Sequence, residues 1–136
     1  MPQPADRLAP LIQAARDAMQ RAHAPYSNFP VGAALRGRDG KIYAGCNVEN
    51  AAYPEGWCAE TSAIAALVLA GGQAIEELVV MGRGEALVTP CGGCRQRIRE
   101  FAAADIPIHV CGPEGLRRSF TLAQLLPQSF GPDNVT

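Results

Sequence analysis

The chain has 136 residues, of which 48% are hydrophobic and 18% are charged, a length and composition typical of one globular domain. Twelve Lys and Arg residues against thirteen Asp and Glu residues give a formal net charge of -1, so the chain lacks the broad basic field that holds a nucleic-acid polymer or an anionic membrane. We therefore expect a single domain over residues 1–136, with neither of these partners.

The N-terminus and the cysteine count indicate the compartment. Residues 1–6 lack the basic and then apolar pattern of an export signal, and the most apolar internal run, residues 63–70, is too short to span a bilayer. The five cysteines are an odd number, which argues against a disulfide framework. We expect a cytoplasmic protein whose thiols serve as ligands, nucleophiles or packing groups.

The first half of the chain predicts a helix, a hairpin and a long loop. Apolar residues recur at helical spacing from Leu8 to Ala22, with Asp6 as N-cap, regular helix starting near Pro10, and an end before Pro25. Two β-rich runs, 31–36 and 41–46, flank an Asp-Gly pair suited to a tight turn. Residues 47–57 show no period, and a loop of this length suggests a function.

The second half alternates helices with strands. Residues 59–70 are apolar on nearly every face and end at Gly71-Gly72, which predicts a buried helix. The further elements expected are strands at 78–82 and 106–111 and helices at 95–104 and 122–126. This alternation predicts an α/β sandwich whose later strands are parallel.

Two cysteine motifs stand at the expected helix starts. They are Cys58-Ala59-Glu60 and Cys91-Gly92-Gly93-Cys94. The positive end of a helix favours a thiolate over a thiol, and a sulfur-rich tetrahedral site suits Zn²⁺. Three protein ligands leave a fourth position for water, whose pKa zinc lowers to about 7. Glu60, two residues after Cys58, is placed to move protons for such a water.

The cysteines also fit other kinds of site. Cys91 and Cys94 alone would also fit a redox pair or half of a structural zinc site, but Cys58-x-Glu60 upstream completes the pattern of zinc deaminases. Cys46 is the candidate fourth ligand of a closed structural site, although it stands alone at a strand end. Cys111 lies within an apolar strand and is expected to pack in the core.

Beyond the metal motifs, longer segments resemble a known family, the small homotetrameric cytidine deaminases. The resemblance runs from about Pro25 to the C-terminus and is carried by residues 25–35, 45–54, 58–60, 90–96 and 125–132. It implies a three-layer α/β/α sandwich with a mixed five-stranded sheet. It also implies one zinc ion per subunit, bound by Cys58, Cys91 and Cys94, with Glu60 as the catalytic proton shuttle.

The same resemblance implies the substrate contacts. Asn47 and Glu49 would hold the ribose hydroxyls, Phe29 would pack on the pyrimidine ring, and the Ala59 amide would contact the base. Tyr53 and Phe130 would line a neighbouring subunit's pocket in a tetramer with shared active sites. Taken alone, Phe29 fits core packing equally well, and the two polar residues fit a turn or a solvated surface.

The activity implied is hydrolytic deamination of free cytidine and 2′-deoxycytidine to the uridines, with release of ammonia, in pyrimidine salvage. The alternatives are a blasticidin-type or other nucleoside deaminase and, more distantly, a non-catalytic zinc module. The chain departs from the family pattern at Thr61, where an Arg often stands near the thiolates. We expect the two helix N-termini, helped by Arg95, to offset the negative charge of the zinc site instead.

Overall fold

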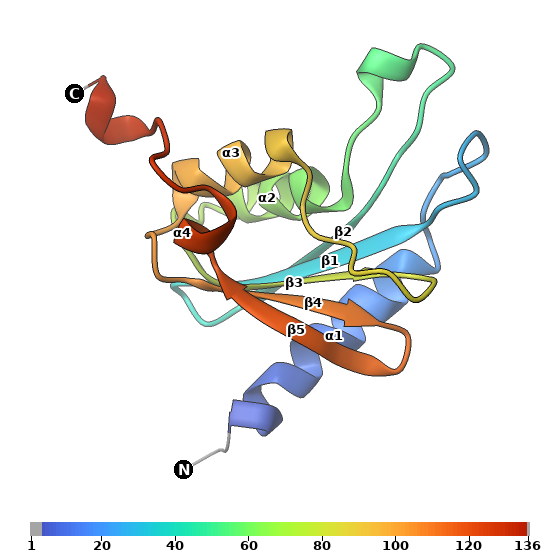
Figure 1. Cartoon of the computed structure of the whole chain (residues 1–136), viewed down its shortest axis with the longest axis horizontal. Coiled ribbons are helices and arrows are strands. Elements are labelled where there is room, and N and C mark those ends of the chain that lie inside the picture. The colour runs from blue at the N-terminus through green and yellow to red at the C-terminus, as the bar shows by residue number, and fades with distance from the viewer. Residues whose placement is uncertain (1–3, 136) are drawn as a thin grey trace.

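The computed structural model describes residues 4–135 as a three-layer α/β/α sandwich around a mixed five-stranded sheet (Figure 1). The strands are β1 (Val31–Gly37), β2 (Ile42–Cys46), β3 (Ile75–Gly82), β4 (Pro107–Gly112) and β5 (Gly115–Thr121). The helices are α1 (Pro4–Met19), α2 (Ala59–Leu69), α3 (Gly92–Phe101) and α4 (Leu122–Leu125), with short 3-10 turns at Tyr53–Glu55 and Pro132–Asn134. The layered fold expected from the sequence is confirmed.

The sheet has the order β2-β1-β3-β4-β5, and β3–β4 is its parallel pair. The hairpin β1–β2 is confirmed, and its turn uses Gly40 at φ +81°, a conformation that glycine adopts readily. The parallel pairing expected of the later strands holds for β3 and β4. It fails for β5, an antiparallel edge strand that the sequence interpretation missed. The adjacent Arg117 and Arg118 interrupt any apolar pattern in this strand.

Helix α1 covers one face of the sheet, and α2, α3 and α4 cover the other (Figure 1). Leu11, Ala15 and Met19 of α1 pack on Val79 and Cys111, which confirms Cys111 as a core residue. The larger core, around Leu35, Leu67 and Ile98 among others, fills the space on the opposite side. The central strands are buried on both faces, which explains their continuous apolar runs.

The helix boundaries differ most from expectation in α1 and α3. Helix α1 begins at Pro4 rather than near Pro10, so Asp6 lies within the helix instead of capping it. Pro10 forgoes one N–H bond inside this helix, a loss that the buried face of α1 outweighs. Helix α3 begins at Gly92 and ends at Phe101, three residues earlier at each end than the predicted 95–104.

Helix α2 lies close against the sheet because of Gly45 in β2. A Cβ atom at Gly45 would lie 2.7 Å from the carbonyl oxygen of Ala59 and closer still to the backbone nitrogen of Ala63. The absent side chain therefore sets the height of the first turn of α2 above the sheet. This is the turn that carries Cys58 as N-cap and Glu60.

The outer face of α2 is not covered within the chain. Val68 is 49% exposed and Leu69 is 90% exposed, so the described residues cover the predicted buried helix only in part. Among the described residues, no helix is long and apolar enough to cross a membrane.

Candidate active site

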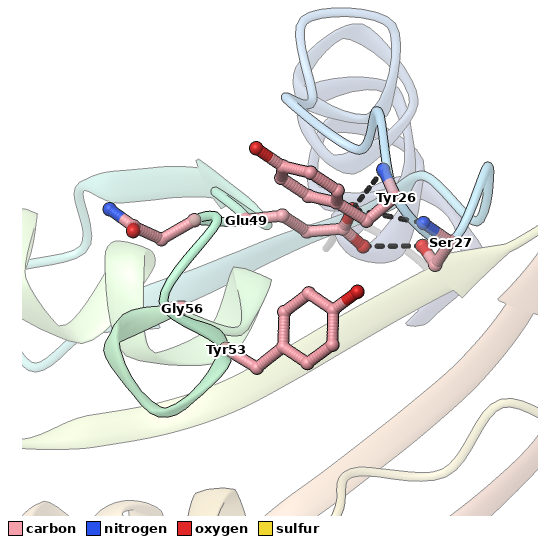
Figure 2. A pocket seen from close by; sticks show the side chains of 6 residues that line it. Tyr26, Ser27, Glu49, Tyr53 and Gly56 are labelled. Carbon is pink, nitrogen blue, oxygen red and sulfur yellow. Dashed lines mark hydrogen bonds between the residues drawn. The ribbon is translucent and has the colours of Figure 1, made fainter.

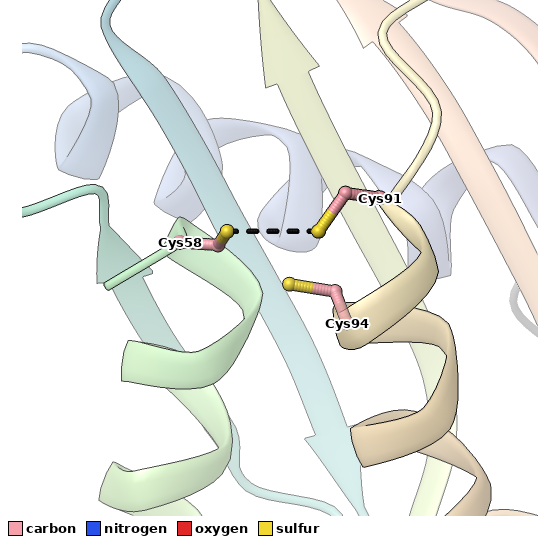
Figure 3. Close-up of side chains that lie close together, drawn as sticks. All are labelled: Cys58, Cys91 and Cys94. Carbon is pink, nitrogen blue, oxygen red and sulfur yellow. Dashed lines mark hydrogen bonds between the residues drawn. The ribbon is translucent and has the colours of Figure 1, made fainter. Parts of the chain in front are cut away.

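Three cysteines converge from two helix N-termini (Figure 3). Cys58 is the N-cap of α2, Cys91 is the N-cap of α3, and Cys94 lies in the first turn of α3. Their sulfur atoms lie within 4.8 Å of one another, and the Sγ atoms of Cys58 and Cys91 are 3.7 Å apart. Zn–S bonds of about 2.3 Å at tetrahedral angles place two sulfurs about 3.8 Å apart, so the donor set and its spacing fit Zn²⁺.

The pKa values of two thiols in this cluster shift in opposite directions. A hydrogen bond with Cys94 lowers the pKa of Cys58 below that of an ordinary thiol, and the same bond, with burial, raises the pKa of Cys94. Cys58 is therefore the first of the two to become a thiolate. A dication replaces the remaining protons when it binds.

The other two cysteines lie outside the cluster. All five cysteines are free thiols, so Cys91 and Cys94 do not form a redox disulfide in this structure. Cys46 is not part of the metal-competent group found among residues 4–135. The group consequently offers three ligands and leaves a fourth position for water or substrate.

Glu60 is the buried charged residue beside the cluster. It is only 4% exposed, and burial raises its pKa above that of an ordinary carboxyl group. A carboxyl group whose pKa moves toward neutrality is suited to accept a proton and return it in one catalytic cycle.

A cavity of about 280 Å³ joins this carboxyl group to the expected substrate contacts. Its lining includes Phe29, Asn47, Glu49, Cys58, Ala59, Glu60 and Cys91. One cavity thus contains three of the residues predicted to bind metal or move protons, together with four of the residues predicted to contact substrate. Ser27, Val31, Val80, Val88 and Thr89 also line it, and the sequence interpretation assigned none of them a role.

The side-chain amide of Asn47 forms hydrogen bonds with the backbone at the start of strand β1. Its Oδ1 accepts a hydrogen bond from the Val31 amide at 2.9 Å, and its Nδ2 donates to the Phe29 carbonyl at 2.9 Å. An Asn side chain has two donor hydrogens and two acceptor lone pairs, so one of each remains for a ligand.

Glu49 is oriented by a neighbouring turn (Figure 2). Its Oε1 accepts from the backbone amides of Tyr26 at 2.9 Å and Ser27 at 3.1 Å, and its Oε2 accepts from the Ser27 hydroxyl. These bonds, led by that of the Ser27 hydroxyl, lower the pKa of Glu49. The carboxylate stays ionised and retains acceptor capacity on Oε2. Ser27 is thus a positioning residue, and its place in the 25–35 segment was the available signal.

The two remaining predicted contacts lie elsewhere. Tyr53 is 75% exposed and lines an adjoining cavity of about 400 Å³, where its ring meets that of Tyr26 edge-on at 5.9 Å (Figure 2). Phe130 is 62% exposed on the C-terminal segment, and its carbonyl accepts a hydrogen bond from Gln96. Neither residue lines the cavity that contains Glu60 in its own chain.

Fold and site together define a class, the zinc-binding deaminases, in which three thiolates and a Glu flank an open metal position. A model of the family described as "Cytidine and deoxycytidylate deaminase zinc-binding region" matches residues 6–110. The chain belongs to this family.

Individual relatives agree with this assignment. A cytidine deaminase of Sporosarcina psychrophila is 41% identical over 126 residues, which cover 93% of each chain. One from Mycobacterium tuberculosis is 38% identical over 122 residues, which cover 89% of this chain and 87% of the relative. Among solved structures, cytidine deaminase from Burkholderia pseudomallei superposes with a TM-score of 0.85 at 40% identity, covering 90% of this chain and 98% of that one.

Proposed function

We propose that the chain catalyses hydrolytic deamination of cytidine and 2′-deoxycytidine to uridine and 2′-deoxyuridine, with release of ammonia. The observation that carries this proposal is the shared cavity, in which the thiolate cluster and a buried Glu face an aromatic ring and two polar side chains. The relatives named cytidine deaminase support the same substrate class.

In this mechanism Cys58, Cys91 and Cys94 would hold one zinc ion, which would supply a water molecule acidic enough to act as nucleophile at neutral pH. Glu60 takes a proton from the attacking water and delivers it to N3 of the pyrimidine ring. After attack at C4, Glu60 moves a proton from the new hydroxyl group to the departing amine. One water is consumed and one ammonia leaves, so the reaction balances without a further reactant.

The nucleoside is oriented by the remaining groups. Phe29 offers an aromatic face to the ring, and the Ala59 amide at the start of α2 donates to the base. Asn47 and the ionised Glu49 bind the ribose hydroxyls with the hydrogen-bonding capacity that their local contacts leave free. Blasticidin S, the antibiotic on which a blasticidin-type deaminase would act, shares the ring to be deaminated but does not carry a ribose for Glu49 to bind.

A panel of cytidine, 2′-deoxycytidine, cytosine and blasticidin S, followed by loss of absorbance, tests the substrate. We expect turnover of both nucleosides, and kcat/KM at least about tenfold lower for the two compounds that lack a ribose or deoxyribose, because the hydrogen bonds to Glu49 and Asn47 are then unmade. Zinc content is measured on the same sample. Absence of turnover of both nucleosides by a zinc-loaded sample would overturn the proposal.

We also propose that the enzyme is a homotetramer with shared active sites, serving pyrimidine salvage in the cytoplasm. Exposed apolar side chains support the assembly: Tyr53 and Phe130 near the site, Trp57 at 52% exposure, and Leu69 on α2. Subunit interfaces cover large apolar side chains that are exposed in the separate chain. In the assembly, Phe130 of one subunit would complete the pocket of another.

Mixing two impaired variants tests the shared site. Phe130→Ala should lower kcat/KM by about tenfold through loss of a buried aromatic contact. Glu60→Gln subunits supply an intact Phe130, so after reassembly of mixed tetramers the activity per Phe130→Ala subunit should rise. If reassembled mixtures show only the sum of the separate activities, Phe130 does not act across subunits.

A further inference from the structure

A second, smaller cavity lies against the metal ligands. Its volume is about 120 Å³, and its lining consists of Pro54, Glu55, Gly56, Trp57, Cys58, Thr61 and Arg97. Cys58 lines both this cavity and the larger one that contains Glu60. Charges in the smaller cavity therefore act on the thiolates without occupying the space assigned to substrate.

Helical spacing brings two further side chains to this cavity. Thr61 follows Cys58 by three residues on α2, and Arg97 follows Cys94 by three residues on α3. Residues three apart share a helix face, so each ligand has its neighbour beside it. Across the two helices, Thr61 Oγ1 lies 3.7 Å from Cys94 Sγ.

The guanidinium of Arg97 turns back toward the N-terminus of α3. A Cβ atom on Gly93 would lie 3.3 Å from Arg97 Nη1, so this nitrogen lies over the turn between Cys91 and Cys94. The positive end of the helix dipole repels a cation, so the helix itself does not stabilise the guanidinium at this position. Arg97 also has no hydrogen-bond or ion-pair partner within residues 4–135.

The other arginines of α3 are engaged elsewhere. Arg95 donates to the carbonyl oxygens of Pro90 at 2.7 Å and Leu125 at 2.8 Å, and to Thr89 Oγ1 at 3.1 Å. The sequence predicted that Arg95 helps to offset the charge of the zinc site, but its hydrogen-bond partners give its guanidinium the role of holding the loop before α3. Arg99 bonds Ser129 and pairs with Asp133.

We propose that Arg97 is a positioning residue that offsets the negative charge of the zinc site from the smaller cavity and so strengthens metal retention. Three thiolates and one Zn²⁺ carry a net charge of about -1, which a nearby cation stabilises. This inference rests on the zinc site of the proposed function. Glu55 is the competing anion on the cavity wall, and no ion pair joins it to Arg97.

Transfer of zinc from the holoenzyme to a chromophoric chelator tests the proposal without using turnover. Partners that surround metal ligands typically contribute 10- to 100-fold to metal affinity, and Arg97 is exposed, so Arg97→Gln should weaken zinc affinity by about tenfold. Arg97→Lys keeps the charge and should stay within about twofold of the parent. Arg38→Gln, which removes the same charge in the β1–β2 turn, should have no effect.

Relocating the charge gives the sharpest result. Thr61→Arg in the Arg97→Gln background places a cation on α2 in the lining of the same cavity, and zinc affinity should recover to within about twofold of the parent. Equal losses in the Gln and Lys variants, or no recovery in the double variant, would overturn the role of Arg97. A parent protein that binds no zinc would instead overturn the zinc site itself.

Discussion

Replacing Glu60 with Gln is expected to abolish turnover while each chain still binds one zinc ion. The amide cannot accept and return a proton, and general acid–base catalysis is worth about 10²- to 10⁴-fold, so kcat should fall by at least about a hundredfold. The three sulfur ligands are untouched, since Glu60 is not part of the metal-competent group. The measurement is single-turnover or steady-state deamination on samples of known zinc content.

The matched control for this change is Glu76→Gln. Glu76 pairs with Arg38 at the exposed start of β3, so its replacement removes one carboxylate far from the cavity. This control should keep the parent kcat. A near-normal kcat in Glu60→Gln with zinc bound would show that another group moves the protons.

Replacing Cys91 with Ala is expected to remove both zinc and activity. Cys91 is exposed, and its side chain makes no capping hydrogen bond to the backbone of α3. The helix itself should therefore still form without it. Loss of a residue that only contacts a metal ligand typically lowers metal affinity or activity by about 10- to 100-fold. Loss of a direct ligand should therefore lower zinc affinity and kcat/KM by at least about a hundredfold. Metal analysis and deamination are measured on the same preparation, with circular dichroism to confirm folding.

Cys46→Ala serves as the control for this second change. Cys46 ends β2 outside the thiol cluster, so this variant should retain zinc and turnover. Loss of zinc from Cys46→Ala would indicate a closed site with four thiolates, which leaves no position for water and contradicts the proposed mechanism.

Much of the fold follows from local patterns. The Asp39-Gly40 turn fixed the hairpin, and the continuous apolar runs located β3 and β4, because these strands are covered on both faces. Strand β5 was not predicted because it lies at the sheet edge and carries two arginines, of which Arg118 is exposed and lies 4.8 Å from the centre of the Phe120 ring. The start of α1 was misplaced because burial of its inner face outweighs the local effect of Pro10.

The sequence alone determined which residue types occupy the two motifs and that both motifs begin helices. Short spacing is a local property, so Cys58 with Glu60 and Cys91 with Cys94 could be interpreted without knowledge of the fold.

Only the tertiary structure decided that these motifs meet. Cys58 and Cys91 are 33 residues apart, and their contact depends on α2 and α3 packing on the same face of the sheet with their N-termini together. The structure likewise separated the surroundings of the α3 arginines, because partners distant in sequence engage Arg95 and Arg99, whereas Arg97 lines a cavity together with Cys58. Long-range contacts of this kind are set by strand order and helix packing, which no local spacing encodes.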